Sequence, residues 1–321
     1  MSSNADPQRS SETQRSPDNK WRGYFAAIVT PFNKDGSIDA AAFRENIRNL
    51  LADRVHGIVV SGTTGEYWAL DDDERTSLFD LAAEEAGGRI TVIGGTTAGK
   101  AERVIAMSRH AKAAGLDGVM IAPPPGSRPN TRELLHHFET IDKGIDIDVM
   151  LYNSPETYGA DITPALVSRL ANLEHIAAIK ESCASIYQQN ETLRLAGDRI
   201  AVLGGWPGLR GLQSFAMGCV GVVGSIEAQV LGGLARELWD SAEAGNLDRA
   251  REIQTKFIQL HQTVTAAAGT APAQLKQAMN LISRPGGYPR LPILPLSTEE
   301  TELVSHALVD LGLEITGKEL A

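Results

Sequence analysis

The sequence predicts an α/β protein built as a (β/α)₈ TIM barrel with a C-terminal helical extension. Short runs rich in β-branched residues alternate with longer helical patterns from residue 24 onward, which is typical of βα units and a parallel sheet. There are eight such runs, the number in this barrel, and no strand pattern follows the eighth. An open doubly wound sheet would give a similar alternation, but eight consecutive units favour closure.

The eight predicted strands follow one another at regular intervals. They span residues 24–32, 57–62, 90–97, 118–123, 148–155, 176–182, 200–206 and 221–226. Between the first two, Phe43, Ile47 and Leu50 recur at helical spacing, as expected of an amphipathic helix that covers a sheet. We therefore assign residues 21–228 to the barrel.

The segments on either side of the barrel have different patterns. Residues 1–20 are Ser, Asn, Gln, Pro and charged groups without an apolar core, so we expect a disordered tail and no secretory signal. Residues 229–321 read as helices, with breaks at Gly245-Asn246 and at residues 285–287. We assign them to a C-terminal helical domain.

Composition narrows the class of protein. Hydrophobic residues make up 42% and charged residues 22%, as in globular proteins with a large core. A net charge of −10 argues against nucleic-acid and anionic-membrane partners, and no apolar run reaches the ~20 residues that span a bilayer. Cys183 and Cys219 have neither disulfide-framework nor metal-site spacing. We expect a soluble cytoplasmic protein without a metal or cofactor.

Active sites of such barrels lie at the carboxyl ends of the strands, and the second predicted strand ends in a distinctive turn. There Gly62 and Gly65 enclose Thr63 and Thr64. Glycine lets the backbone turn tightly, and the turn would present amides beside two hydroxyls. We expect this segment to form a carboxylate cradle.

Two further reactive groups stand at neighbouring strand ends. The fifth strand places the phenol of Tyr152 at the barrel mouth, where it could move a proton or simply pack at the rim. The sixth, an apolar run, delivers the amine of Lys180, which either reacts or extends from the strand end into solvent. A nucleophilic lysine must be deprotonated, and burial lowers its pKa from the ordinary ~10.4. Amine, phenol and cradle together match a 2-oxo acid: a carbonyl trap, a proton carrier and a carboxylate anchor.

These motifs resemble the dihydrodipicolinate synthase and N-acetylneuraminate lyase superfamily of class I aldolases. The resemblance covers nearly the whole chain after the tail and rests on residues 62–66, Leu70, residues 74–75, Tyr152-Asn153 with Pro155, and residues 179–181. It implies that Lys180 forms the imine, that Tyr152 shuttles protons, and that Thr63 and Thr64 hold the carboxylate of pyruvate or a pyruvate-like moiety. It also implies a homotetramer.

The sequence departs from both branches of that family. In the synthase branch, two tyrosines in the fourth βα loop include one that completes a proton relay across a subunit interface, but residues 122–128 contain none. Thr157 stands where that branch has an arginine for the second substrate. The sialic-acid lyase branch has acidic groups after the seventh strand, where residues 204–208 are Gly-Gly-Trp-Pro-Gly.

Bulky residues take the place of those polar groups. Tyr67 and Trp68 follow the cradle, and Trp206 follows the seventh strand. Either they line a distal pocket for a smaller or more apolar 2-oxo acid, or they pack under loops or at a subunit interface. Trp206 and Ser225 are the expected distal binding residues. Glu156 and Arg128 are further candidates for polar recognition.

The sequence thus predicts a lyase, an aldolase or a dehydratase, that acts on a 2-oxo acid through a lysine Schiff base. The imine would act as the electron sink for C–C cleavage or loss of a β-hydroxyl, with Tyr152 as acid or base. A 4-hydroxy-tetrahydrodipicolinate synthase is the first alternative. A barrel that binds a keto acid without turnover is the second.

Overall fold

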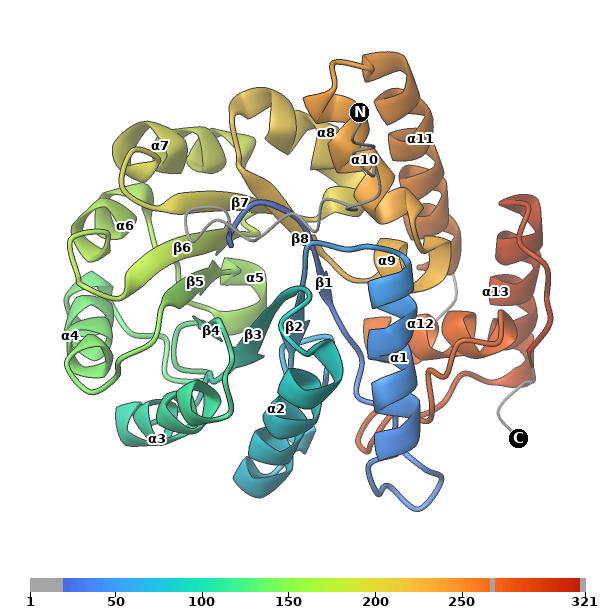
Figure 1. The fold of residues 1–321 in the computed structure, drawn as a ribbon, viewed down its shortest axis with the longest axis horizontal. Helices are drawn as coiled ribbons and strands as arrows, with labels where there is room; N and C mark the ends of the chain where they lie inside the picture. Colours follow the sequence, from blue (N-terminus) through green and yellow to red (C-terminus); the bar gives the residue numbers. More distant parts are fainter. Residues whose placement is uncertain (1–19, 266–268, 318–321) are drawn as a thin grey trace, which may run out of the picture.

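The computed structural model describes residues 20–265 and 269–317, and it confirms the predicted barrel. Eight parallel strands close in sequence order, with β8 paired to β1 (Figure 1). Most strands are shorter than the predicted runs, because the last residues of each run belong to the following loop. The strands are β1 Gly23–Ala27, β2 Gly57–Val60, β3 Thr91–Gly95, β4 Gly118–Ile121, β5 Val149–Asn153, β6 Ile176–Glu181, β7 Ala201–Gly205 and β8 Gly221–Gly224.

Helices between the strands form the outer layer of the barrel (Figure 1). The first of them buries Phe43, Ile47 and Leu50, as the sequence spacing predicts. The helices are α1 Ala40–Ala52, α2 Asp72–Ala86, α3 Ala101–Ala113, α4 Thr131–Asp142, α6 Pro164–Leu170, α7 Ile186–Ala196 and α8 Pro207–Met217. The 3₁₀ turn η2 Tyr67–Ala69 and the short α5 Pro155–Tyr158 lie in loops at the carboxyl ends of β2 and β5.

A separate apolar cluster fills the inside of the barrel. Its members from neighbouring strands include Phe25, Val59, Met120 and Leu203. Alternate residues of a strand point to the same side, so the inward positions of each strand are fixed by this packing. Only the residues that alternate with these inward-facing positions in steps of two can therefore place their side chains at the barrel mouth.

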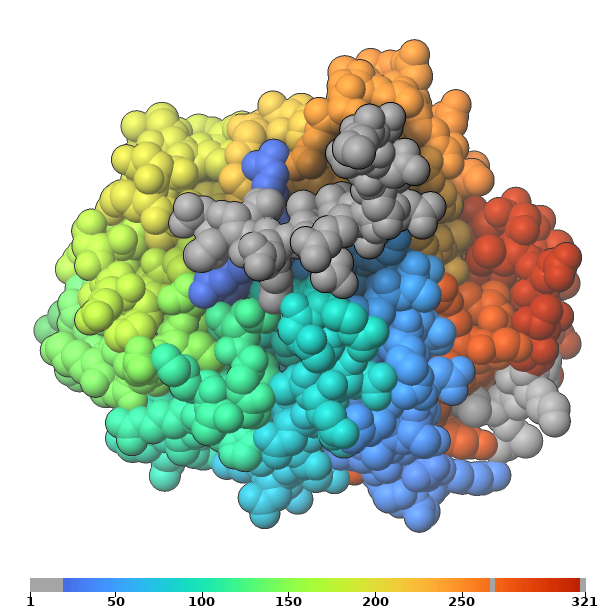
Figure 2. Space-filling model, in the orientation of Figure 1, coloured from blue at the N-terminus to red at the C-terminus, as the bar shows by residue number. Residues whose placement is uncertain are grey.

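The C-terminal helices gather on one side of the barrel (Figures 1 and 2). They are α9 Ile226–Leu231, α10 Leu234–Glu243, α11 Leu247–Val264, α12 Ala271–Leu281 and α13 Thr298–Asp310. Both predicted breaks are confirmed: Asn246 caps α11, and residues 285–287 follow α12. A third apolar cluster, with Val29, Leu260, Leu275 and Val304, packs these helices against the loop after β1. Residue 229, the predicted start of this region, falls within α9.

The predicted N-terminal tail lies outside the described residues, apart from Lys20. The ammonium of Lys20 is 2.5 Å from the carboxylate of Asp148, just before β5. Within the described ranges, no helix is both long enough and apolar enough to cross a membrane.

Candidate active site

Tyr152 and Lys180 lie side by side at the barrel mouth. They are direct partners in the register of β5 and β6. Both continue the inward-facing positions of Met150 and Ala178, which belong to the cluster inside the barrel. The Lys180 Nζ is 4.4 Å from the centroid of the Tyr152 ring. The two groups that the sequence singled out are thus brought together over an apolar floor.

Residues 62–65, which we expect to bind a carboxylate and call the cradle, lie in the turn after β2. Within the described chain, the backbone N–H groups of Thr63 and Thr64 have no hydrogen-bond partner, so both are available to a bound anion. The Thr30 hydroxyl donates to the Gly65 carbonyl at 2.8 Å and fixes the far side of the turn.

The glycines of the cradle serve close packing rather than an unusual backbone conformation. The left-handed positions of the turn are Ser61 and Glu66, with φ of 54° and 56°. A Cβ on Gly65 would lie 3.2 Å from backbone atoms of Ile28 and Ser61, and a Cβ on Gly62 would lie 3.2 Å from Met120. Close backbone packing therefore favours glycine at position 65, whereas at position 62 the near atom is the flexible end of the Met120 side chain.

A buried arginine forms hydrogen bonds that hold the cradle in place. Arg75, on α2, donates to the Ser61 hydroxyl at 3.2 Å and to the carbonyls of Gly95 and Thr97. Burial lowers the pKa of Arg75 to about 10, which leaves it a cation at neutral pH. The guanidinium therefore joins the loops after β2 and β3 and holds the cradle in place.

A buried ion pair ties the cradle to the C-terminal helices. Glu66, directly after the cradle, and Lys276, on α12, form an ion pair in which both side chains are fully buried. The backbone N–H of Arg290 donates to the second Glu66 oxygen at 3.0 Å, and Lys276 donates to the Tyr288 carbonyl at 2.8 Å. Burial lowers the pKa of Lys276 below its ordinary value.

A cavity of about 310 Å³ lies at the barrel mouth beside Tyr152 and Lys180. Six of the eight predicted site residues line it: Thr63, Thr64, Tyr152, Lys180, Trp206 and Ser225. Gly62 and Gly65 do not line the cavity but shape the turn behind it. Neither Glu156 nor Arg128 contributes to the lining.

The C-terminal helices supply a wall that sequence reasoning did not assign to the site. His261 and Thr265, at the end of α11, and Gln274, on α12, line the cavity. Their sequence gives no signal of this, because they reach the mouth only through the packing of α11 and α12 on the barrel. Three more lining residues were also missed, although Ser182 ends a predicted strand and Thr157 and Glu227 closely follow predicted strands.

Two tryptophans stand at the outer part of the cavity, each 45% exposed. Trp206 has a left-handed backbone, with φ of 59°, and its indole N–H donates to the Ser182 carbonyl at 2.9 Å. Its ring meets His261 edge to face at a centroid distance of 6.3 Å. Trp68 meets Tyr67 in the same way at 5.7 Å. Both indoles are held by neighbours while their surfaces remain open.

Tyr158 is a further residue near the site that the sequence did not reveal. It lies on α5, six residues after Tyr152, and its hydroxyl is 3.1 Å from the Thr63 hydroxyl. Burial raises the pKa of Tyr158 well above its ordinary value, and the nearby Tyr67 and Tyr152 raise it further. Tyr158 is therefore a neutral hydroxyl in direct contact with the cradle.

A carboxyl group is buried directly behind the candidate nucleophile. Glu181 follows Lys180 and points out of the barrel, where it accepts hydrogen bonds from the Cys183 N–H at 2.8 Å and from the Asn153 amide at 3.1 Å. Burial raises the pKa of Glu181 to about 7, against the opposing effect of these hydrogen bonds. This carboxyl changes its charge near neutral pH.

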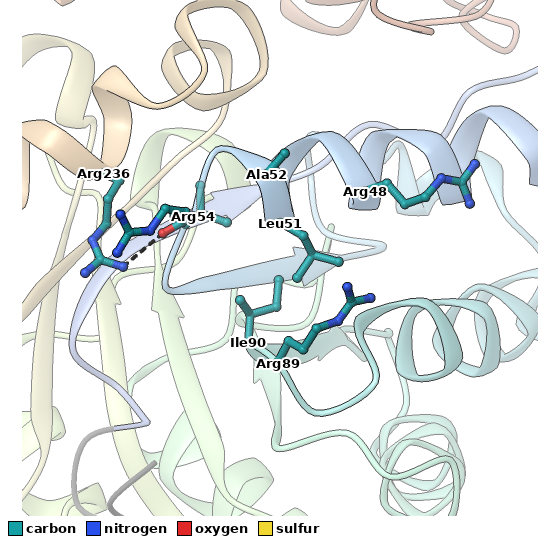
Figure 3. A pocket seen from close by; sticks show the side chains of 8 residues that line it. Arg48, Leu51, Ala52, Arg54, Arg89, Ile90 and Arg236 are labelled. Atoms are coloured by element: carbon teal, nitrogen blue, oxygen red, sulfur yellow. Dashed lines mark hydrogen bonds between the residues drawn. The ribbon is translucent and has the colours of Figure 1, made fainter. Parts of the chain in front are cut away.

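A second hollow, of about 600 Å³, lies at the opposite end of the barrel (Figure 3). Val55 and Ile90, just before β2 and β3, are part of its lining. Four arginines surround it: Arg48, Arg54, Arg89 and Arg236. Arg48 forms an ion pair with Glu85 and Arg236 with Asp240, while Arg89 donates to the Glu85 and Ala86 carbonyls. We assign no ligand to it.

Comparison with known proteins gives consistent results. The model of the dihydrodipicolinate synthetase family matches residues 20–311. A DapA-like lyase from Rhizobium meliloti is 34% identical over 86% of this chain and 91% of its own length. A 4-hydroxy-tetrahydrodipicolinate synthase from Methanothrix thermoacetophila is 33% identical over 92% and 99%. The structure of the prophage protein YagE from E. coli K12, in complex with pyruvate, has a TM-score of 0.84 at 25% identity, covering 91% of this chain and 99% of its own.

Proposed function

The chain belongs to the dihydrodipicolinate synthetase family, and we propose that its Lys180 binds a 2-oxo acid as a Schiff base. Members of this family are class I lyases, and this chain is a lyase of that class. The single observation that carries the proposal is the pairing of Lys180 with Tyr152 at the mouth, in one cavity with the free amides and hydroxyls of Thr63 and Thr64.

Each group has a defined part in the proposed chemistry. The Thr63 and Thr64 amides hold the carboxylate, which places the adjacent carbonyl carbon within reach of the Lys180 amine. Attack and loss of water give a protonated imine, which draws electrons from the neighbouring carbon. Tyr152 then moves the proton that C–C cleavage, loss of a β-hydroxyl or condensation requires.

The outer part of the cavity favours a substrate with an apolar or aromatic distal group. Trp68 and Trp206 offer open indole faces, and Ile226 and Pro272 add apolar surface. Among the described lining residues Lys180 is the one lysine or arginine, and in this proposal it forms the imine. A second carboxylate would therefore meet no further lysine or arginine among the described lining residues, since position 157 is a threonine. We therefore favour a lyase that acts on an apolar 2-oxo acid over a synthase whose second substrate carries a carboxylate. Because the cavity extends well past Lys180, we do not favour a smaller substrate.

Intact-mass measurement after incubation with pyruvate and borohydride tests the imine. Pyruvate is the suitable first probe, because it is the ligand in the YagE structure. We expect an adduct in the native chain, no adduct in Lys180→Ala, and an undiminished adduct in Lys256→Ala, which changes an exposed lysine of α11. An adduct that persists in Lys180→Ala would refute the proposal.

A panel of 2-oxo acids tests the distal group. We expect turnover of acids with an aryl or alkyl substituent to exceed that of acids with a second carboxylate or several hydroxyls. The reverse order would contradict the proposed substrate class. Adduct formation without turnover of any acid would favour a barrel that binds keto acids without catalysis.

Two expectations about the setting of the enzyme are also part of this proposal. We propose a homotetramer, which sedimentation analysis would test. Family members include a dihydrodipicolinate synthase variant described as monomeric, so a single species of monomer mass is the contrary result.

We propose a cytoplasmic location on the composition and the two cysteines, both free and buried.

A further inference from the structure

A row of hydroxyl groups leads from the cradle toward the outside of the barrel. The Thr63 hydroxyl lies 3.1 Å from that of Tyr158. The rings of Tyr158 and Tyr67 are nearly parallel, with centroids 6.5 Å apart, and a side-chain hydrogen bond joins their phenols. Tyr67 is half-buried, whereas Tyr158 is 5% exposed. The row therefore begins inside the site and ends at a group that solvent reaches.

The position of Tyr158 is fixed by the loop that follows its own strand. The Tyr158 N–H donates to the Ser154 carbonyl at 3.0 Å, and Gly159, with φ of 70°, ends the short helix. The Tyr158 ring meets the Tyr152 ring edge to face at a centroid distance of 5.6 Å. One chain thus places Tyr158 against both the proton carrier and the cradle.

Its chemical state suits a group that passes protons on. Because burial raises the pKa of Tyr158, the phenol stays protonated and does not act as a base. A neutral hydroxyl can accept a proton from one neighbour while donating its own to the next. The same holds for Tyr67, whose pKa burial also raises, although its hydrogen bond with Tyr158 acts in the opposite direction.

We propose that Thr63, Tyr158 and Tyr67 form a hydroxyl relay within one chain, through which the proton removed from the imine reaches solvent. This rests on the proposed Schiff-base function. The C3–H bond breaks, its electron pair forms the C2–C3 double bond, and the imine nitrogen becomes neutral. Tyr152 receives the proton and passes its own to Thr63, which passes one to Tyr158 and then to Tyr67 and water. Each hydroxyl ends neutral, and one proton has moved from carbon to solvent.

The relay also removes the need for a hydroxyl from a second subunit. The fourth βα loop, residues 122–128, contains no tyrosine. Tyr158 instead approaches the Thr63 hydroxyl from α5 of the same chain. Tyr158 and Tyr67 are relay residues that act through Tyr152 and Thr63, so their effect belongs to proton transfer and not to imine formation.

Exchange of the pyruvate methyl hydrogens in D₂O, followed by NMR, isolates this step because it needs the imine and the proton transfer but no distal substrate. We expect Tyr158→Phe to form the borohydride-trapped adduct as the native chain does, while the exchange rate falls by about 10- to 100-fold. Tyr67→Phe should lower exchange by a smaller factor. Tyr187→Phe is the matched control, because Tyr187 is 70% exposed on α7, and it should exchange at the native rate.

The outcomes separate this inference from the proposed function. Absence of an adduct in the native chain would refute the Schiff base itself. A native adduct with unchanged exchange in Tyr158→Phe would overturn the relay alone. Loss of both adduct and exchange in a folded Tyr158→Phe would also overturn it, because the residue would then only shape the cradle. If Tyr158→Phe fails to fold, Tyr67→Phe decides, and native exchange there overturns the relay.

Discussion

The two ends of the barrel use charged residues in opposite ways. At the carboxyl ends of the strands, the half-buried Lys180 lines a cavity of about 310 Å³, and Glu181 and the Glu66–Lys276 pair are fully buried behind the site. At the amino ends, a larger hollow of about 600 Å³ is lined by four arginines, two of which form ion pairs with carboxylates at the surface (Figure 3). The size of a hollow and its number of cations therefore do not locate the chemistry.

The two ends differ in the desolvation free energy of their charged side chains. A charge held out of water must have a partner, and a site that contains such charges has been built around them. The Arg48 side chain is 53% exposed where it meets Glu85, so water solvates most of that pair. Glu66 and Lys276 are 0% exposed. Mutations at the two ends should therefore differ in effect.

The largest effect on stability is expected from Lys276→Met. It would leave Glu66 charged and unpaired in the interior beside the cradle, which costs about 3–5 kcal/mol of unfolding free energy. Urea unfolding at neutral pH measures the loss. Lys276→Met with Glu66→Gln should recover part of it, and Lys256→Met on the exposed side of α11 should change little. Equal stability of Lys276→Met and the native chain would show that the pair is solvated.

The second prediction concerns Glu181 at the carboxyl end. Its pKa is raised to about 7 in the folded chain from an ordinary 4.5, so the folded state holds this proton more tightly than the unfolded state. This contribution to stability is complete below pH 4.5 and is lost as the pH rises through 7, a change on the order of 3 kcal/mol. Glu181→Gln should remove this fall from a series of urea midpoints against pH. An identical slope in both proteins would contradict the buried carboxyl.

The third prediction is the opposite pH dependence at the amino end. The Nδ1 of His56, just before β2, accepts a hydrogen bond from the Tyr24 N–H at 3.0 Å and must be neutral to do so. Burial, and then the nearby Arg236, lower the pKa of His56 from 6.5 to about 4. Its contribution is present above pH 6.5 and is lost as the pH falls through 4.

His56→Asn tests this, because the asparagine oxygen can replace Nδ1 as acceptor but does not titrate. Allowing for the partial exposure of the ring, we expect about 2 kcal/mol less acid destabilisation between pH 6.5 and 4. Glu181→Gln serves as the cross-control, since its effect has the other sign. A variant that loses stability toward acid as steeply as the native chain would remove His56 from the comparison.

The sequence predicted those parts of the carboxyl end that depend on local pattern. The order of the strands and the position of Tyr152 and Lys180 near the carboxyl ends of two neighbouring runs predicted that both groups lie at one end of the barrel, and the register pairs them directly. It also predicted the tight turn after the second strand, although for an incomplete reason, since the left-handed residues are Ser61 and Glu66 rather than the glycines.

The rest of the site depends on contacts between distant segments. Tyr158 and Thr63 are 95 residues apart, and neither has a local pattern that announces the other. His261 lines the cavity because α11 packs beside α8. Lys276 pairs with Glu66 because α12 packs next to the cradle. Amphipathic spacing predicts that such helices pack, but it does not say which of their polar residues will meet the mouth of the barrel.

The smallest effect is expected from Arg54→Ala at the amino end. Arg54 is exposed, and within the described residues its guanidinium has no hydrogen-bond or ion-pair partner, while its carbonyl accepts from Arg236 at 3.0 Å. Loss of the side chain should therefore change the free energy of unfolding by less than about 0.5 kcal/mol. Its left-handed backbone, with φ of 60°, makes Arg54→Gly the matched variant, which should be neutral or slightly stabilising. Unchanged pyruvate exchange in both would show that the arginine-lined hollow is separate from the chemistry. A several-fold loss of exchange in Arg54→Ala would instead mean that the two ends are coupled.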